Sequence, residues 1–106
     1  MFESGPNLDA QGFRALDPAK VQILDVREPW EYALARLPGA RLIPMGELVD
    51  RVGELDPTRP LAAYCHHGVR SHIALRLLRQ AGFTELAHLA GGIEGYSDLD
   101  PRVPRY

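Results

Sequence analysis

The sequence predicts an α/β fold in which a mostly parallel sheet is covered by helices on both faces. Short apolar runs of strand length alternate with segments of helical spacing, and proline and glycine mark the turns between them. Strands that alternate with helices pair in parallel, and the connecting helices then cover the sheet. Ligands of such sheets bind beyond the carboxyl ends of the strands, so functional residues are expected there.

A helix and a strand are predicted at the start of the chain. The helix lies around residues 9–16, because Asp9 suits the N-cap position and Pro18 prevents continuation. The apolar run at residues 21–26 is the first clear strand. Pro29 then begins a short helix, since the first helical position does not need the N–H group that proline lacks.

The middle of the chain repeats this alternation. The Pro38-Gly39 turn leads into a strand at residues 40–43. A helix is predicted over residues 46–55, where apolar side chains recur at helical spacing, and Asp56-Pro57 ends it. The next strand, residues 61–64, runs directly into Cys65.

An amphipathic helix over residues 71–80 follows the Cys65 loop. Its expected apolar face consists of Ile73, Ala74, Leu77 and Leu78. Gly82 stands where a glycine C-cap is expected. The last predicted strand covers residues 84–89, and a short helix near residues 93–98 completes the pattern.

Length and composition describe one small domain over residues 1–106, with residues 1–7 expected to be a loosely ordered N-terminal segment. The chain is 45% hydrophobic and 25% charged, as in ordinary globular proteins. Its net charge of −2 argues against a nucleic-acid partner, and no apolar run reaches the roughly 20 residues that span a membrane. The N-terminus does not resemble a secretory signal, so a cytoplasmic location is expected.

Cys65 is the only cysteine, which excludes an intramolecular disulfide and any multi-cysteine metal or iron–sulfur site. Between a strand and a helix, its sulfur is expected to receive the loop amides and the positive end of the helix dipole. Both favour the thiolate, which is the form that attacks sulfur. Gly68 allows a backbone conformation that a β-carbon would hinder, and Arg70 supplies a fixed charge for the loop or an anionic substrate.

A buried, inert thiol in a tight turn is the alternative interpretation of this loop. That alternative predicts small, bland residues around the cysteine. The segment instead places His66, His67 and Arg70 beside Cys65. The composition of the loop therefore favours a functional cysteine.

Four segments resemble, in order, the motifs of the rhodanese-like sulfurtransferase family. They are Asp25-Val26-Arg27-Glu28-Pro29-Trp30-Glu31-Tyr32, Leu37-Pro38-Gly39-Ala40, Cys65-His66-His67-Gly68-Val69-Arg70-Ser71, and the closing Gly82-Phe83 with Leu89-Ala90-Gly91-Gly92-Ile93. The C-terminal Val103-Pro104-Arg105-Tyr106 is similar to small bacterial rhodaneses and to rhodanese domains appended to sulfur-carrier adenylyltransferases. Ala35-Arg36 and Gly95-Tyr96 depart from the family pattern, but they lie outside the Cys65 loop.

The resemblance implies a five-stranded parallel domain in which Cys65 carries sulfur as a persulfide, with no metal or organic cofactor. The substrate-binding residues it implies are His66, His67, Gly68, Val69 and Arg70, and the residues that support the loop are Asp25 and Ser71. The implied partners are a small-molecule sulfur donor such as thiosulfate and a thiophilic acceptor, which includes a sulfur-carrier protein or a thioredoxin-like thiol.

Several polar residues have both a functional and an ordinary interpretation. Asp25 is expected to pair with an arginine, for example Arg70, and to fix the loop. Arg27 and Arg36 are candidates for attracting an anionic donor, or they are ordinary surface arginines. His72 and His88 are interpreted more simply as helix-surface and strand residues.

Two other functions remain open at this point. A cysteine phosphatase requires Cys-x5-Arg spacing to surround a tetrahedral phosphate, whereas Cys65 and Arg70 have Cys-x4-Arg spacing. The shorter loop suits a single sulfur atom and favours sulfur transfer. A non-enzymatic rhodanese-like binding module, or a persulfide relay to a partner protein, is the second alternative, although binding modules commonly lack the cysteine.

Overall fold

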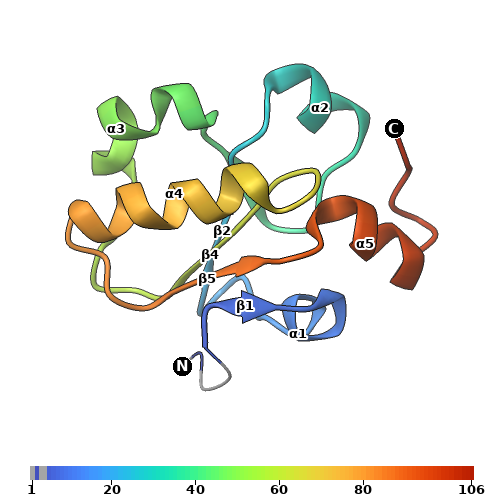
Figure 1. Ribbon diagram of the computed structural model, residues 1–106, viewed down its shortest axis with the longest axis horizontal. Helices are drawn as coiled ribbons and strands as arrows, with labels where there is room; N and C mark the ends of the chain where they lie inside the picture. The colour runs from blue at the N-terminus through green and yellow to red at the C-terminus, as the bar shows by residue number, and fades with distance from the viewer. Residues whose placement is uncertain (1, 3–4) are drawn as a thin grey trace.

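In the computed structural model, which describes residues 2 and 5–106, five parallel strands form a sheet in the order β1-β5-β4-β2-β3 (Figure 1). The strands are β1 (Asn7–Leu8), β2 (Gln22–Asp25), β3 (Ala40–Leu42), β4 (Leu61–Tyr64) and β5 (Leu86–Leu89). The central strand β4 is buried along its whole length, as expected for parallel strands covered on both faces. The predicted fold class is therefore confirmed.

The fifth strand comes from the N-terminal segment. Asn7 and Leu8 pair with His88 and Leu89 of β5. Asn7 therefore lies in the sheet, whereas it was expected in a loosely ordered segment. Met1, Glu3 and Ser4, which the same expectation covered, lie outside the described residues. A two-residue strand is too short to show a period of two, and it forms because β5 offers a free edge for hydrogen bonding.

The helices begin and end largely where the sequence indicates. They are α1 (Ala10–Arg14), α2 (Pro29–Leu34), α3 (Leu48–Arg51), α4 (Val69–Gln80) and α5 (Gly92–Leu99). Asp9 caps α1 by accepting a hydrogen bond from the Gly12 N–H at 2.7 Å, and Pro29 is the first residue of α2. The predicted helix at residues 46–55 is instead a short α3 between 3₁₀ turns at Met45–Glu47 and Val52–Glu54, each containing a glycine that disfavours regular helix.

Helices cover both faces of the sheet. α3 and α4 lie on one side, and α1 and α5 lie on the other (Figure 1). Alternate strand residues supply the two cores, because successive side chains of a strand point to opposite faces. Leu24 and Ala63 join the core on the α3 and α4 side, whereas Ile23 and Tyr64 join the core on the α1 and α5 side.

The buried face of α4 differs from the predicted one. Its buried residues are Ser71, Ala74, Leu75 and Leu78, whereas Ile73 is 40% exposed and Leu77 is only partly buried. Both sets repeat at helical spacing, so periodicity alone does not choose between them. The hydrogen bonds that bring Ser71 to Cys65 fix the rotation of the helix.

The carboxyl ends of β2, β4 and β5 lie at one edge of the sheet. There Tyr64, the last residue of β4, donates its hydroxyl hydrogen to Asp25 at 2.8 Å and accepts from the Leu37 N–H at 3.1 Å. None of the described helices is long and apolar enough to cross a membrane. Cys65 follows Tyr64 directly, so the candidate site lies at this edge.

Replacing Tyr64 with phenylalanine tests how much the strand end depends on this hydroxyl. We expect Tyr64→Phe to lower the free energy of unfolding in urea by about 1–3 kcal/mol, because two buried hydrogen-bonding partners lose their contact. Tyr32→Phe is the matched control, since the Tyr32 hydroxyl is only partly buried and has one bond, to the Ala40 carbonyl. Equal losses in the two variants would contradict the special role of Tyr64.

Candidate active site

The Cys65 sulfur sits inside a loop whose amides point toward it. Sγ accepts hydrogen bonds from the Gly68 N–H at 3.0 Å and the Ser71 N–H at 3.4 Å, and the Ser71 hydroxyl oxygen lies 3.6 Å away. Only 1% of Cys65 is exposed. N–H groups at the start of α4 therefore surround the sulfur, an arrangement that favours a negatively charged sulfur.

Two glycines allow the loop to pack closely against the turn between β5 and α5. Gly68 has a φ of +102°, and a β-carbon there would lie 2.1 Å from the Ala90 carbonyl oxygen. Gly92 has a φ of +67°, and a β-carbon there would lie 2.0 Å from the His66 carbonyl oxygen. The left-handed backbone expected for Gly68 is observed. Gly92, in the turn that packs against the loop, likewise has no room for a β-carbon.

The N-terminus of α5 holds the carbonyl side of the loop. The Ile93 N–H donates to the Cys65 carbonyl at 2.8 Å, and the Glu94 N–H donates to the His66 carbonyl at 3.2 Å. Amides of α4 thus contact the sulfur while amides of α5 contact the loop carbonyls. The two contacts together fix the orientation of the loop.

Arg70 pairs with Glu31 of α2 and not with Asp25, so the suggested Asp25–Arg70 pair is wrong. The Arg70 guanidinium makes two contacts with the Glu31 carboxylate, at 2.7 and 3.0 Å. Burial would raise the pKa of Glu31, but hydrogen bonds from Arg70, the Glu28 N–H and the Tyr106 hydroxyl lower it to about 2. The Arg70 side chain remains 32% exposed.

Asp25 instead binds Arg27, two residues further along the chain. The Arg27 guanidinium contacts the carboxylate at 2.7–3.2 Å, donates to the Ala35 carbonyl at 2.5 Å and donates to the Tyr106 hydroxyl at 2.6 Å. Both side chains of the Asp25–Arg27 pair are fully buried. Arg27 is therefore structural, and the suggestion that it attracts a donor is wrong. Exposed Arg36 stacks over the Tyr32 ring at 4.6 Å.

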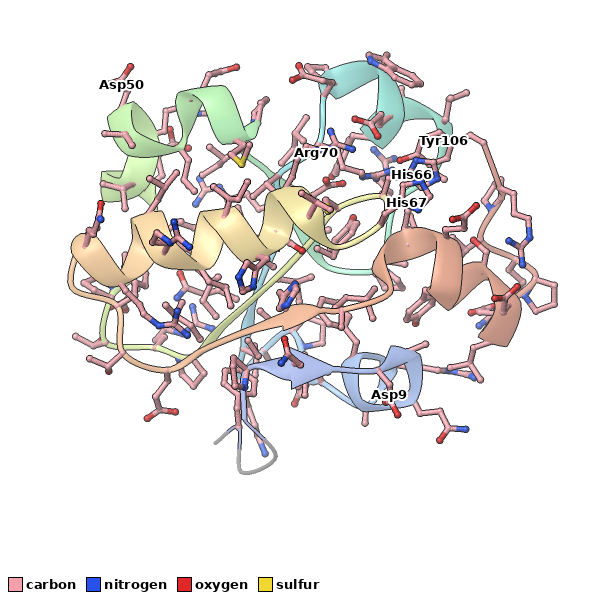
Figure 2. The ribbon with its side chains drawn as sticks, viewed as in Figure 1. Asp9, Asp50, His66, His67, Arg70 and Tyr106 are labelled. Carbon is pink, nitrogen blue, oxygen red and sulfur yellow. The ribbon has the colours of Figure 1, made fainter. Side chains whose placement is uncertain are left out.

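The histidines of the loop pack against the C-terminal residue. The His66 ring stacks on the rings of His67 and Tyr106, with centroid distances of 4.1 and 4.3 Å (Figure 2). Burial and the neighbouring charge of His67 lower the pKa of His66 below 6.5, so its ring is neutral at pH 7. Burial and the Glu31 carboxylate raise the pKa of Tyr106 to about 12 against the opposing effect of Arg27, so its hydroxyl keeps the hydrogen that it donates to Glu31.

His66, His67 and Glu94 also have ligand atoms within 4.8 Å of one another, a spacing compatible with a metal ion. His67 Nδ1 lies 2.8 Å from the Glu94 carboxylate, and the His66 ring is stacked between the His67 and Tyr106 rings. The function proposed for the loop does not require a metal ion.

Glu31, Tyr106 and His88 are site residues that sequence reasoning missed. Glu31 forms a capping box with Glu28, which signals a helix start but not a contact with Arg70. Tyr106 and His88 reach the loop from distant parts of the chain. The C-terminal motif contains Tyr106 but does not indicate its contacts, and no local pattern marks His88.

A cysteine held by amides between a parallel strand and a helix defines a class of α/β proteins that carry a cysteine loop at the carboxyl ends of the strands. Within that class, the chain belongs to the rhodanese-like domain family, whose sequence pattern matches residues 13–99. The four motifs identified in the sequence lie within this range.

Named relatives include sulfurtransferases. The thiosulfate sulfurtransferase GlpE of Pseudomonas paraeruginosa is 34% identical over 88 residues, which cover 83% of this chain and 80% of that protein. YqhL of Bacillus subtilis is 41% identical over 75 residues, or 71% of this chain, and the probable adenylyltransferase/sulfurtransferase MoeZ of Mycobacterium tuberculosis is 38% identical over 90 residues, or 82% of this chain. The chain spans 60% of YqhL and 23% of MoeZ.

Solved structures share the fold. The crystal structure of a rhodanese-related protein from Thermoplasma volcanium has a TM-score of 0.81 at 27% identity, over 90% of this chain and 93% of that chain. Reduced CoADR-RHD of Bacillus anthracis has a TM-score of 0.85 at 26% identity, over 94% of this chain and 18% of that chain.

The lowered pKa of Glu31 predicts that this residue stabilises the fold at neutral pH and loses that contribution in acid. Its folded pKa of about 2 lies below its ordinary value of 4.5, so the stabilisation is complete above pH 4.5 and is lost as the pH falls toward 2. We expect Glu31→Gln to lower the free energy of unfolding at pH 7 by up to about 3 kcal/mol and to flatten its pH dependence in this window. Urea unfolding between pH 2 and 7 measures both effects.

The control for this prediction is Glu54→Gln, which removes a carboxylate that pairs with Arg51 on the surface. We expect a much smaller change, because water screens that exposed pair. A Glu31 variant with the pH dependence of the wild type would contradict the assignment.

Proposed function

We propose that this protein is a sulfurtransferase that moves a sulfane sulfur from a donor such as thiosulfate to a thiophilic acceptor through a Cys65 persulfide. The observation that carries the proposal is the loop from Cys65 to Arg70, in which the Gly68 amide and the amide of the following Ser71 contact the Cys65 sulfur. The similarity to relatives that are named thiosulfate sulfurtransferase supports it.

The proposed reaction has two steps with Cys65 as the nucleophile. In the first, the Cys65 thiolate attacks the outer sulfur of thiosulfate, the S–S bond of the donor breaks, and sulfite leaves with the bonding electron pair. In the second, the acceptor attacks the outer sulfur of the persulfide, and Cys65 leaves as the thiolate. With cyanide as acceptor the product is thiocyanate, and both steps conserve charge.

The loop residues have distinct proposed roles. The backbone amides of residues 66–70 stabilise the negative outer sulfur of the persulfide, because several N–H donors around one anion are more effective than solvent. Arg70 attracts the anionic end of the donor, while His66 and His67 form the wall nearest Tyr106. Asp25 and Ser71 support the loop through Arg27 and Cys65 respectively.

A carrier protein is a second proposed acceptor class. Trp30, which is 60% exposed, contacts the Tyr106 ring edge-on beside the stacked histidines, and Val69 in the loop is 68% exposed. Exposed aromatic and aliphatic side chains around a reactive group favour the binding of a protein partner, whereas a small anion such as cyanide does not need them. The relatives YrkF, a putative sulfur carrier protein, and MoeZ support this reading.

Intact mass spectrometry tests the proposed persulfide. After incubation with thiosulfate we expect a mass gain of about one sulfur atom, which cyanide removes with release of thiocyanate. Cys65→Ser is the control and gains nothing. An unchanged mass with several sulfane donors would favour the binding-module alternative, and Cys65-dependent hydrolysis of an aryl phosphate faster than sulfur transfer would favour a phosphatase.

Removing the charge of Arg70 tests whether this residue attracts an anionic donor. Arg70→Ala leaves the Glu31 carboxylate without its cation, so we expect kcat/KM for thiosulfate to fall at least roughly tenfold. A neutral sulfane donor is expected to lose much less. Combining Arg70→Ala with Glu31→Gln removes both charges and is expected to recover part of the loss.

Arg76→Ala, an exposed change further along α4, controls for the general loss of positive charge. Equal losses for charged and neutral donors in Arg70→Ala would show that Arg70 only supports the loop.

A further inference from the structure

A chain of polar side chains leads from Cys65 to the edge strand β1. The Ser71 hydroxyl lies 3.6 Å from Cys65 Sγ and 2.8 Å from His88 Nδ1, and His88 Nε2 lies 2.9 Å from Asn7 Oδ1. Cys65, Ser71 and His88 are 1%, 0% and 4% exposed. These contacts join the loop, α4, β5 and β1, and the sulfur-transfer steps above do not use His88.

The hydrogen bonds of this chain can all run in one direction. Asn7 Oδ1 is an acceptor, so His88 carries its hydrogen on Nε2 and leaves the lone pair of Nδ1 facing Ser71. The Ser71 hydroxyl has one hydrogen, and its 2.8 Å contact with Nδ1 is shorter than its 3.2 Å contact with the Gly68 carbonyl. The Ser71 oxygen is then free to accept the thiol hydrogen of Cys65.

The His88 ring is uncharged at pH 7, so the lone pair of one ring nitrogen is available to Ser71. Burial and the neighbouring His72 lower its pKa below 6.5, so the ring is neutral at pH 7. His72 of α4 is the titratable group facing the ring among the described residues, at a centroid distance of 5.5 Å, besides Cys65 through Ser71. On the neighbouring strands, Asn7 and Ala63 do not titrate.

The chain also reaches solvent. A surface hollow of about 390 Å³ is lined by residues that include Asn7, Val69, His72 and His88. Asn7 and His72 are exposed there. A proton on His88 can therefore reach water in this hollow, next to the exposed Asn7 and His72. The Cys65 sulfur has no such route of its own, because Cys65 is 1% exposed.

We propose that His88 is a positioning residue that accepts the Cys65 proton through Ser71 and so maintains the thiolate that attacks the sulfur donor. The thiol hydrogen moves from Sγ to the Ser71 oxygen as the Ser71 hydrogen moves to His88 Nδ1. The products are the Cys65 thiolate and the His88 imidazolium, and the imidazolium returns its proton to water in the hollow after the persulfide forms. The proposal rests on the sulfurtransferase function proposed above.

The pH dependence of Cys65 alkylation by iodoacetamide tests this proposal without requiring sulfur transfer. The informative variant is His88→Asn, because the asparagine amide oxygen can still accept from Ser71 but cannot take up a proton. We expect alkylation at pH 6–7 to slow roughly tenfold and to approach the wild-type rate near pH 9, where solvent removes the thiol proton. Ser71→Ala is expected to show the same profile.

The double variant Ser71→Ala/His88→Asn is expected to be no slower than either single variant, because both changes interrupt one route. Gln80→Ala is the control, an exposed change at the other end of α4, and is expected to stay within about twofold of the wild type. Thermal unfolding of each variant confirms that the compared proteins are folded.

A His88→Asn rate that is unchanged, or lower by the same factor at every pH, would overturn the proposal, since a purely structural role has no reason to vanish at high pH. The thiosulfate mass gain separates this failure from failure of the proposed function. If His88→Asn does not slow Cys65 alkylation at pH 6–7 but the wild type gains mass with thiosulfate, only the proton route is refuted. If His88→Asn slows alkylation as expected but the wild type gains no mass with thiosulfate, only sulfur transfer is refuted.

Discussion

Arg27 carries its positive charge into the interior of the protein, where its side chain is fully shielded from solvent. An unpaired buried charge is very unfavourable, so the fold surrounds this one with acceptors from three parts of the chain: Asp25, the Ala35 carbonyl and Tyr106. Burial would lower the pKa of Arg27, but the hydrogen bonds to Asp25 and Tyr106 raise it, so the guanidinium stays charged. The end of β2, the end of α2 and the C-terminus are thereby held together.

The same network reaches the Cys65 loop. Tyr106 donates to Glu31, and Glu31 holds Arg70 at the start of α4. Two carboxylates and two guanidinium groups alternate along this path, so their charges balance. Each charge of the network therefore has a partner of opposite sign, and the groups that contact the Cys65 sulfur directly are the Gly68 and Ser71 amides. The Ser71–His88 contact joins the start of α4 to β5 and contains no carboxylate or guanidinium group.

Local signals in the sequence were enough to predict much of the framework. Asp9, Pro29 and the strand that ends before Cys65 were placed correctly, because capping, proline geometry and apolar runs act over a few residues. The partner of Arg70 was not predictable, since Glu31 lies 39 positions away and several carboxylates were equally plausible. Tyr106 and His88 were missed for the same reason: their roles depend on contacts with Arg27 and Ser71 that only the folded chain creates.

The close packing of the loop explains why its length matters for the chemistry. Gly68 lies against Ala90 and Gly92 lies against His66 so closely that neither position has room for a β-carbon. The α5 amides hold the loop carbonyls at the same time, so the loop is restrained on the side away from the sulfur. A loop fixed in this way cannot readily widen around a tetrahedral anion, because widening would break backbone hydrogen bonds that have no other buried partner. The packing agrees with the proposed selection of a single sulfur atom by the backbone, and the side chains that a proposed acceptor would meet beside the loop are the Trp30 and Tyr106 rings and the exposed Val69.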